Sequence, residues 1–248
     1  MIRFIRLGTP THLPPLYAVP GLDGSIGTVE PVVKDLARRR EVIVVDFSAE
    51  TNPTLEALAS EIATQIRTEG QSAFDILGQS IGTIVATQVA TLHHLPVRKV
   101  VLTCTFTILR WRLLRLVVVL LKFTPAWLYR LTAPLTIAVS CGPVGDGRQH
   151  PALSAARQAD KGSAARRTAW QIDRDFAVDL ARIQTPLLIL MGDCDRFVPN
   201  ARREIARLRQ VFAQRPSARV DVIPGAGHIF LPSHSIQLAV ARIEEFLA

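Results

Sequence analysis

A serine and a histidine in this sequence have the surroundings that nucleophilic catalysis requires. Ser80 is the centre of GQSIG (78–82), which follows a short apolar run and precedes a helix-like pattern. A serine hydroxyl is a weak nucleophile at neutral pH unless a base takes its proton. His228, in the glycine-rich stretch IPGAGHIF (223–230), can act as that base. The two residues predict acyl transfer through a covalent intermediate on the serine.

A catalytic histidine also needs a carboxylate that orients its imidazole and stabilises its cation. Asp193 and Asp195 are the two candidates, in GDCD (192–195) after the apolar run LLILM. Either carboxylate could serve on composition alone, and the other could cap the loop. The chain order serine, aspartate, histidine differs from the orders of the two familiar types of serine protease.

The two glycines around Ser80 suit a sharp turn between a strand and a helix. Gly78 and Gly82 have no Cβ that would clash as the strand and the helix close together. Ser80 would then project its hydroxyl out of the sheet, near the free amide groups at the start of the helix. The arrangement predicts a nucleophile at the top of a sheet, where a strand ends and a helix begins.

Six short apolar runs predict the strands that must position these residues. They are LYAV (16–19), EVIVVDF (41–47), FDIL (74–77), KVVLTC (99–104), LLILMG (187–192) and RVDVIP (219–224). Segments with apolar residues at three- and four-residue spacing predict helices over 27–39, 54–70, 81–94, 201–214 and 234–247. This alternation predicts an α/β protein with a mostly parallel sheet flanked by helices.

Some helix ends are also marked in the sequence. Asn52-Pro53-Thr54 and Pro199-Asn200 are typical helix starts, and Gly70 is a typical C-terminal stop.

A long segment interrupts the alternation after the strand that ends near Cys104. The stretch 106–135 predicts helices broken at Pro125 and Pro134, and a glycine-rich turn (141–147) and a more polar helical segment (151–180) follow. A structureless loop of this length is improbable in a compact domain. We therefore expect a core domain formed by 1–104 and 184–248, with a helical cap inserted at 105–183.

The chain resembles the α/β-hydrolase fold superfamily over nearly all of its length apart from the cap. The motifs that carry the resemblance are GQSIG, GDCD (192–195) and GAGH (225–228). The resemblance implies a Ser80–His228–Asp195 triad, since family spacing selects Asp195 over Asp193. Another family variant places the acid after the strand that precedes the cap, but TCTFT (103–107) has no carboxylate there.

The resemblance also implies an oxyanion hole formed by the amides of Leu22 and Ile81. Leu22 lies in VPGLDGS (19–25), where many members carry His-Gly; here Pro20-Gly21 resembles the Pro-Gly of thioesterase-like members. We expect Asp23 to point away from the oxyanion and to hydrogen-bond its own turn, because a carboxylate beside it would repel the developing charge.

Charge and cysteine content limit the other function classes. The formal net charge is +8, and residues 104–181 carry most of the excess of Lys and Arg. There is no zinc-finger spacing, RNA-recognition motif or groove-binding basic helix, so we expect no nucleic-acid partner. Three cysteines make no disulfide framework, and the N-terminus lacks the pattern of a signal peptide. These features predict a cytoplasmic protein.

The basic, apolar part of the cap has more than one interpretation. Arg110, Arg112, Arg115 and Lys122 flank the apolar run 116–121. The segment can pack over the catalytic cleft, contact a membrane surface, or do both. Contact between copies of the chain alone is a third alternative. Phe106, Trp111 and Trp127 are the cap candidates for substrate contact.

The sequence thus predicts a serine hydrolase acting on a carboxylic ester with an apolar acyl group, without a metal or cofactor. The alternative is a thioesterase acting on a coenzyme A or carrier-protein thioester, whose phosphate would meet the basic cap. Esters of membrane lipids are a third substrate class. Because the fold also hosts binding proteins, a non-catalytic binding module is the alternative from another class.

Overall fold

Seven strands form a single sheet in the order β1-β3-β2-β4-β5-β6-β7. The computed structural model describes residues 2–51, 54–92, 94–107, 111–146, 150–172, 174–198 and 200–248, and only the backbone of 111–113 and 140. The strands are β1 (Arg3–Leu7), β2 (Leu16–Val19), β3 (Val42–Asp46), β4 (Phe74–Gln79), β5 (Val97–Thr103), β6 (Leu187–Gly192) and β7 (Ala218–Ile223). All neighbours pair in parallel except β1 and β3. The predicted mostly parallel sheet is confirmed.

The sequence patterns missed the edge strand β1. Two of its five residues, Arg3 and Arg6, are basic and interrupt the apolar side chains, so the strand carries a weaker signal than a continuous apolar run. Long-range ion pairs fix it against β3: Arg3 lies 3.3 Å from Asp46, and Arg6 lies 2.6 Å from Glu41. These partners are far from β1 in the sequence, so no local pattern predicts the pairing.

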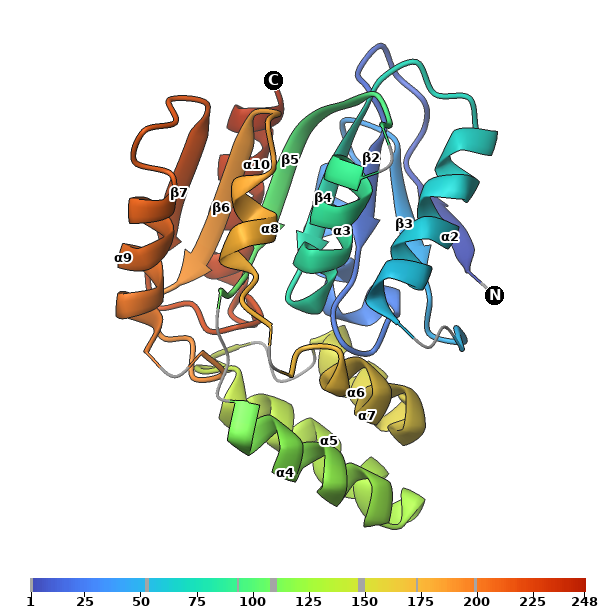
Figure 1. Ribbon diagram of the computed structural model, residues 1–248, viewed down its shortest axis with the longest axis vertical. Helices are drawn as coiled ribbons and strands as arrows, with labels where there is room; N and C mark the ends of the chain where they lie inside the picture. The colour runs from blue at the N-terminus through green and yellow to red at the C-terminus, as the bar shows by residue number, and fades with distance from the viewer. Residues whose placement is uncertain are drawn as a thin grey trace.

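Helices cover both faces of the sheet (Figure 1). One face carries α2 (Leu55–Thr68), α3 (Ile81–Leu92), α8 (Ala177–Ala181) and α9 (Ala201–Val211), and the other carries α1 (Glu30–Leu36) and α10 (Ser233–Leu247). A short 3-10 helix, η1 (Ile26–Thr28), follows β2. Alternate strand residues therefore enter two cores: Tyr17 and Val19 pack on the α2–α3 side, and Leu16 and Ala18 on the α1–α10 side.

Three of the predicted helix ends are confirmed. The side chain of Thr54 accepts a hydrogen bond from Ala57 N at the start of α2, and Asn200 accepts one from Arg203 N at the start of α9. Gly70 follows the C-cap of α2 with a φ of 68°, a left-handed conformation that favours glycine. Asn52, Pro53 and Pro199 lie outside the described residues.

In the described part of the segment between β5 and β6, helices α4 to α7 lie beyond the carboxyl ends of the strands (Figure 1). They are α4 (Trp111–Phe123), α5 (Ala126–Ser140), α6 (Pro151–Gln158) and α7 (Lys161–Ala169). Figure 1 places α6 and α7 next to the sheet and α4 and α5 farther out. The two ends of this segment are hydrogen-bonded to each other: Phe176 N donates to Thr107 O at 2.9 Å. The end of the cap, expected at residue 183, lies just after α8. Helix α8 itself packs against α3 and α9 on the sheet.

One predicted helix break is correct and one is wrong. Pro125 is the N-cap of α5 and separates it from α4, as predicted. Pro134, however, lies inside α5, which continues to Ser140. A proline removes the hydrogen bond to the carbonyl four residues earlier. That carbonyl belongs to Arg130, an exposed residue, so water can replace the lost donor.

Candidate active site

Ser80 occupies a strained turn between β4 and α3. Its φ is 56°, which is uncommon for a residue other than glycine. Neighbouring backbone holds this conformation: Ser80 N donates to Thr103 O at 3.0 Å, and Thr83 N donates to Ser80 O at 2.9 Å. A backbone of this kind costs about 1–3 kcal/mol and persists only where its surroundings impose it. The turn directs the hydroxyl away from the sheet.

The glycines of GQSIG permit close packing and do not supply a left-handed backbone. A Cβ on Gly78 would lie 2.7 Å from Thr83 Cα, so β4 and α3 could not approach as they do. A Cβ on Gly82 would overlap the carbonyl oxygens of Val19 and Pro20 at the end of β2. The strain is confined to Ser80, and the glycines allow α3 to begin against two strands.

The structure brings Ser80, His228 and Asp195 into one hydrogen-bonded row. Ser80 Oγ lies 2.7 Å from His228 Nε2, and His228 Nδ1 lies 2.7 Å from Asp195 Oδ2. A carboxylate only accepts hydrogen bonds, so Nδ1 carries the proton and Nε2 can accept one from the serine. His228 and Asp195 are buried, whereas Ser80 is partly exposed. This arrangement can activate the hydroxyl towards a carbonyl.

The two aspartates of GDCD have different partners. Asp195 accepts bonds from Phe197 N and Val198 N through Oδ1, at 2.8 and 3.0 Å, which leaves Oδ2 for the imidazole. Asp193 accepts a bond from Gly225 N at 2.7 Å and thus ties the loop after β6 to the loop after β7. Asp195 therefore contacts the imidazole, whereas Asp193 joins two loops and has no contact with His228 among these bonds.

The chain that leaves α5 supports the histidine loop, a contact that the sequence did not indicate. His228 N donates to Cys141 O, and a Cβ on Gly227 would overlap the Cys141 carbonyl. The ring of Phe197 lies over the imidazole, with centroids 4.5 Å apart. Gly227 is therefore required for the close approach of a distant segment. The only sequence signal was the glycine-rich turn after α5.

The loop after β2 approaches Ser80 closely. A Cβ on Gly21, the residue before Leu22, would lie 3.6 Å from Ser80 Cβ. Ile81 is the first residue of α3, so its amide has no acceptor within that helix. Asp23 accepts bonds from Ser25 Oγ and Thr28 Oγ1, as expected of a carboxylate that serves its own turn. Burial raises the pKa of Asp23.

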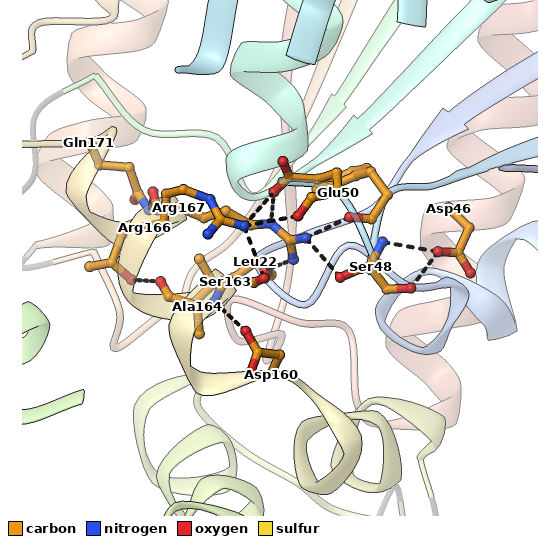
Figure 2. Close-up of polar contacts among 12 residues, drawn as sticks. Leu22, Asp46, Ser48, Glu50, Asp160, Ser163, Ala164, Arg166, Arg167 and Gln171 are labelled. Carbon is orange, nitrogen blue, oxygen red and sulfur yellow. Dashed lines mark hydrogen bonds and ion pairs between the residues drawn. The ribbon is translucent and has the colours of Figure 1, made fainter. Parts of the chain in front are cut away.

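A buried arginine from α7 holds the same loop (Figure 2). Arg167 Nη1 donates to Leu22 O at 2.8 Å, and its Nη2 donates to Ser48 O at 3.2 Å. Its Nε donates to Glu50 at 3.0 Å, and the guanidinium lies 4.8 Å from the centre of the Phe47 ring. The Arg167 and Glu50 side chains are 1% and 0% exposed. One side chain thus joins α7 to the loops after β2 and β3.

Sequence patterns missed this arginine. It is the second of two consecutive arginines in a polar helical segment, where a charged side chain is ordinarily exposed. Glu50 lies more than a hundred residues away, and its burial is visible only once the strands are assembled.

The three residues named as candidates for substrate contact lie in different surroundings. Phe106 is fully buried and packs edge-on against Phe176 at 5.6 Å, so it belongs to the core. Trp127 is 67% exposed on α5. The side chain of Trp111 lies outside the described part of the chain.

Besides the site around Ser80, we find no reactive cysteine site and no metal site within the described residues. Burial raises the pKa of Cys104 well above its usual value and that of Cys141 to about 12, as is typical of structural cysteines. Cys194 is exposed. No group of three or more His, Cys, Asp or Glu side chains in the described ranges is placed to hold a metal ion.

Replacing Arg167 with methionine should destabilise the protein by about 3–5 kcal/mol, because Glu50 would be left buried without its main cationic partner. Urea denaturation measures the change in the free energy of unfolding. The matched control is Arg182→Met, whose exposed pair with Asp179 should contribute under about 1 kcal/mol. The double variant Arg167→Met/Glu50→Gln should recover part of the loss. An Arg167→Met protein within about 1 kcal/mol of wild type would contradict the role of this contact.

Comparison with known proteins identifies the family. The family described as "Alpha/beta hydrolase family" matches residues 17–242. No curated protein matches the sequence.

Solved structures share the fold at low sequence identity. A hydrolase from Pseudomonas aeruginosa PA01 has 17% identity and a TM-score of 0.81, over 100% of this chain and 94% of that one. A thermophilic esterase from Thermogutta terrifontis has 21% identity and a TM-score of 0.77, covering 99% and 92%. An esterase from Exiguobacterium antarcticum has 14% identity and a TM-score of 0.82, covering 99% and 95%. With the sheet topology and the motifs around Ser80 and His228, the family match shows that the chain belongs to the alpha/beta hydrolase family.

Proposed function

We propose that this protein is a serine hydrolase that cleaves a carboxylic ester of an apolar acyl group. The observation that carries the proposal is the row from Ser80 Oγ through the His228 imidazole to Asp195, with both contacts at 2.7 Å. A strained serine at a strand-to-helix turn adds support, since such strain clusters at functional sites.

In the proposed first half-reaction, Ser80 Oγ attacks the acyl carbonyl while His228 Nε2 takes the hydroxyl proton. The carbonyl π electrons move onto oxygen, and the amides of Leu22 and Ile81 stabilise the resulting oxyanion. When the tetrahedral intermediate collapses, the bond to the leaving oxygen breaks and His228 gives that oxygen its proton. An alcohol departs, and the acyl group stays on Ser80.

The second half-reaction uses water as the nucleophile. His228 takes a proton from water, the hydroxide attacks the acyl carbon, and the same two amides stabilise the second oxyanion. Collapse returns the proton to Ser80 Oγ and releases the carboxylic acid. Asp195 accepts the hydrogen bond from Nδ1 through Oδ2 and so stabilises the imidazolium in both half-reactions.

The apolar character of α4 and α5, beyond the carboxyl ends of the strands, favours an apolar acyl group. Two of the structural relatives are esterases, which favours an ester over other acyl substrates.

A thioester of a phosphorylated carrier is the second candidate. A groove of about 430 Å³ lies between α4 and α7, with an apolar floor that includes Val118 and Leu121. Lys122, Lys161 and Arg166 also line it, and such side chains bind phosphate well. The Pro20-Gly21 pair in the loop beside Ser80, which resembles that of thioesterase-like members, also favours a thioester.

A panel of p-nitrophenyl esters and coenzyme A thioesters with matched acyl chains of graded length distinguishes these candidates. We expect a higher kcat/KM for the esters, rising with acyl length as more apolar surface is buried. Ser80→Ala should lower kcat by at least about 10³-fold while circular dichroism stays unchanged. Higher kcat/KM values for the thioesters would favour the second candidate, and full activity of Ser80→Ala would refute both.

Paired asparagine variants test the choice of acid. Asp195→Asn should lower kcat by about 10³- to 10⁴-fold, because an amide can hold the imidazole in the wrong tautomer and cannot stabilise its cation. Asp193→Asn, the matched control, should change kcat by less than about tenfold, since its carboxylate bonds Gly225 N and not the imidazole. A larger loss of kcat at Asp193 would show that the acid is assigned wrongly.

A further inference from the structure

The outer side of α4 presents a continuous apolar stripe. Leu116, Val119, Leu120 and Phe123 are 52%, 49%, 55% and 82% exposed. Their spacing of three and four residues places them along one face of the helix. Leu114 and Val118 of the same helix are each only 8% exposed, so α4 buries one face and leaves a second apolar face uncovered.

Helix α5 repeats this feature. Trp127, Leu131, Leu135 and Val139 recur every four residues and are 67%, 70%, 66% and 60% exposed. Figure 1 places α4 and α5 farthest from the sheet, at the end where its strands terminate. The remaining exposed large apolar side chains of the described chain, Leu92, Val178 and Leu238, belong to separate helices or helix ends. Apolar exposure of this kind marks a binding surface.

The charge of these helices selects the kind of partner. Residues 111–140 contain four basic side chains, Arg112, Arg115, Lys122 and Arg130, and no Asp or Glu. Of these, Arg115, Lys122 and Arg130 are exposed beside the apolar stripes. A second copy docked face to face would bring like charges together. An anionic lipid surface supplies both an apolar interior and a negative boundary.

The dimensions fit helices that lie in the plane of a membrane. With 13 residues, α4 is about 20 Å long, shorter than the roughly 30 Å hydrocarbon core. Throughout the described ranges, no helix combines the length and apolar content needed to cross a bilayer. An amphipathic helix with basic residues and an exposed tryptophan suits the boundary between headgroups and acyl chains.

We propose that the exposed face of α4 and α5 docks on an anionic lipid bilayer. Phe123 and Trp127, on either side of the turn between the helices, enter the acyl boundary. Lys122 and Arg130 pair with anionic headgroups. The carboxyl ends of the strands then face the membrane side of the molecule (Figure 1). Ser80 directly follows the end of β4. The binding does not depend on the reaction proposed for Ser80.

Flotation of the full chain with vesicles tests the proposal. We expect binding to 3:1 phosphatidylcholine–phosphatidylglycerol vesicles at about 50 mM salt, weaker binding at about 500 mM, and little binding to pure phosphatidylcholine. Phe123→Ser/Trp127→Ser should weaken binding at least about tenfold. Lys122→Gln/Arg130→Gln should weaken it about 25-fold at low salt, at about fivefold for each charge.

The matched control is Val178→Ser/Leu238→Ser, which removes exposed apolar side chains from α8 and α10. This variant should bind as wild type, and all variants should keep the wild-type circular dichroism spectrum. Three results would overturn the proposal: no binding to the anionic vesicles at low salt; unchanged binding by Phe123→Ser/Trp127→Ser; or self-association, abolished by that variant, without vesicle binding.

Discussion

The left-handed backbone of Ser80 is the constraint on which the site depends. The chain must leave β4 in the middle of the sheet, turn within one residue and enter a helix packed against β2 and β4. Only the missing Cβ atoms of Gly78 and Gly82 allow that packing. The strain at Ser80 is therefore imposed by the buried sheet and helix, and it holds the hydroxyl where His228 can reach it.

The sheet order then determines which loops can meet Ser80. Ligand sites in open α/β sheets lie outside the carboxyl ends of the strands, near the point where the strand order reverses. In this sheet the strand order reverses between β3 and β4. Because β2, β4, β6 and β7 run parallel, the loops that follow them all lie at the carboxyl ends of the strands. Asp195 and His228 come from two of these loops, and Leu22 from the third. The topology therefore brings these three loops to the same end of the sheet.

The helices beyond the sheet are part of this framework. Arg167 of α7 bonds the carbonyl of Leu22, and Cys141 after α5 bonds the amide of His228. Movement of these helices would therefore disturb the loops on two sides of Ser80. The buried Arg167–Glu50 pair is costly to break, so α7 is the firmly held part of the insertion. The exposed α4 and α5 can meet a partner without loss of that contact.

Much of this could be predicted because the signals are local. Apolar runs gave the six parallel strands, and glycine, serine and asparagine patterns marked the loops and helix ends. What could not be predicted rests on distant partners. β1 is fixed by ion pairs with residues far away in the sequence. The structural role of Arg167 becomes visible only in the folded chain, where its partner Glu50 is buried. Helix α5 continues through Pro134, and the residue that loses a donor there, Arg130, is exposed. A proline in the sequence does not reveal that exposure.

Covalent labelling tests whether Ser80 is an activated nucleophile. The folded protein is incubated with a fluorophosphonate, and the modified residue is mapped by mass spectrometry. We expect one phosphonyl group, attached to Ser80, and none on the folded Ser80→Ala variant. Absence of label on folded wild type, or equal labelling of Ser80→Ala, would contradict a catalytic role and leave a binding function for this fold.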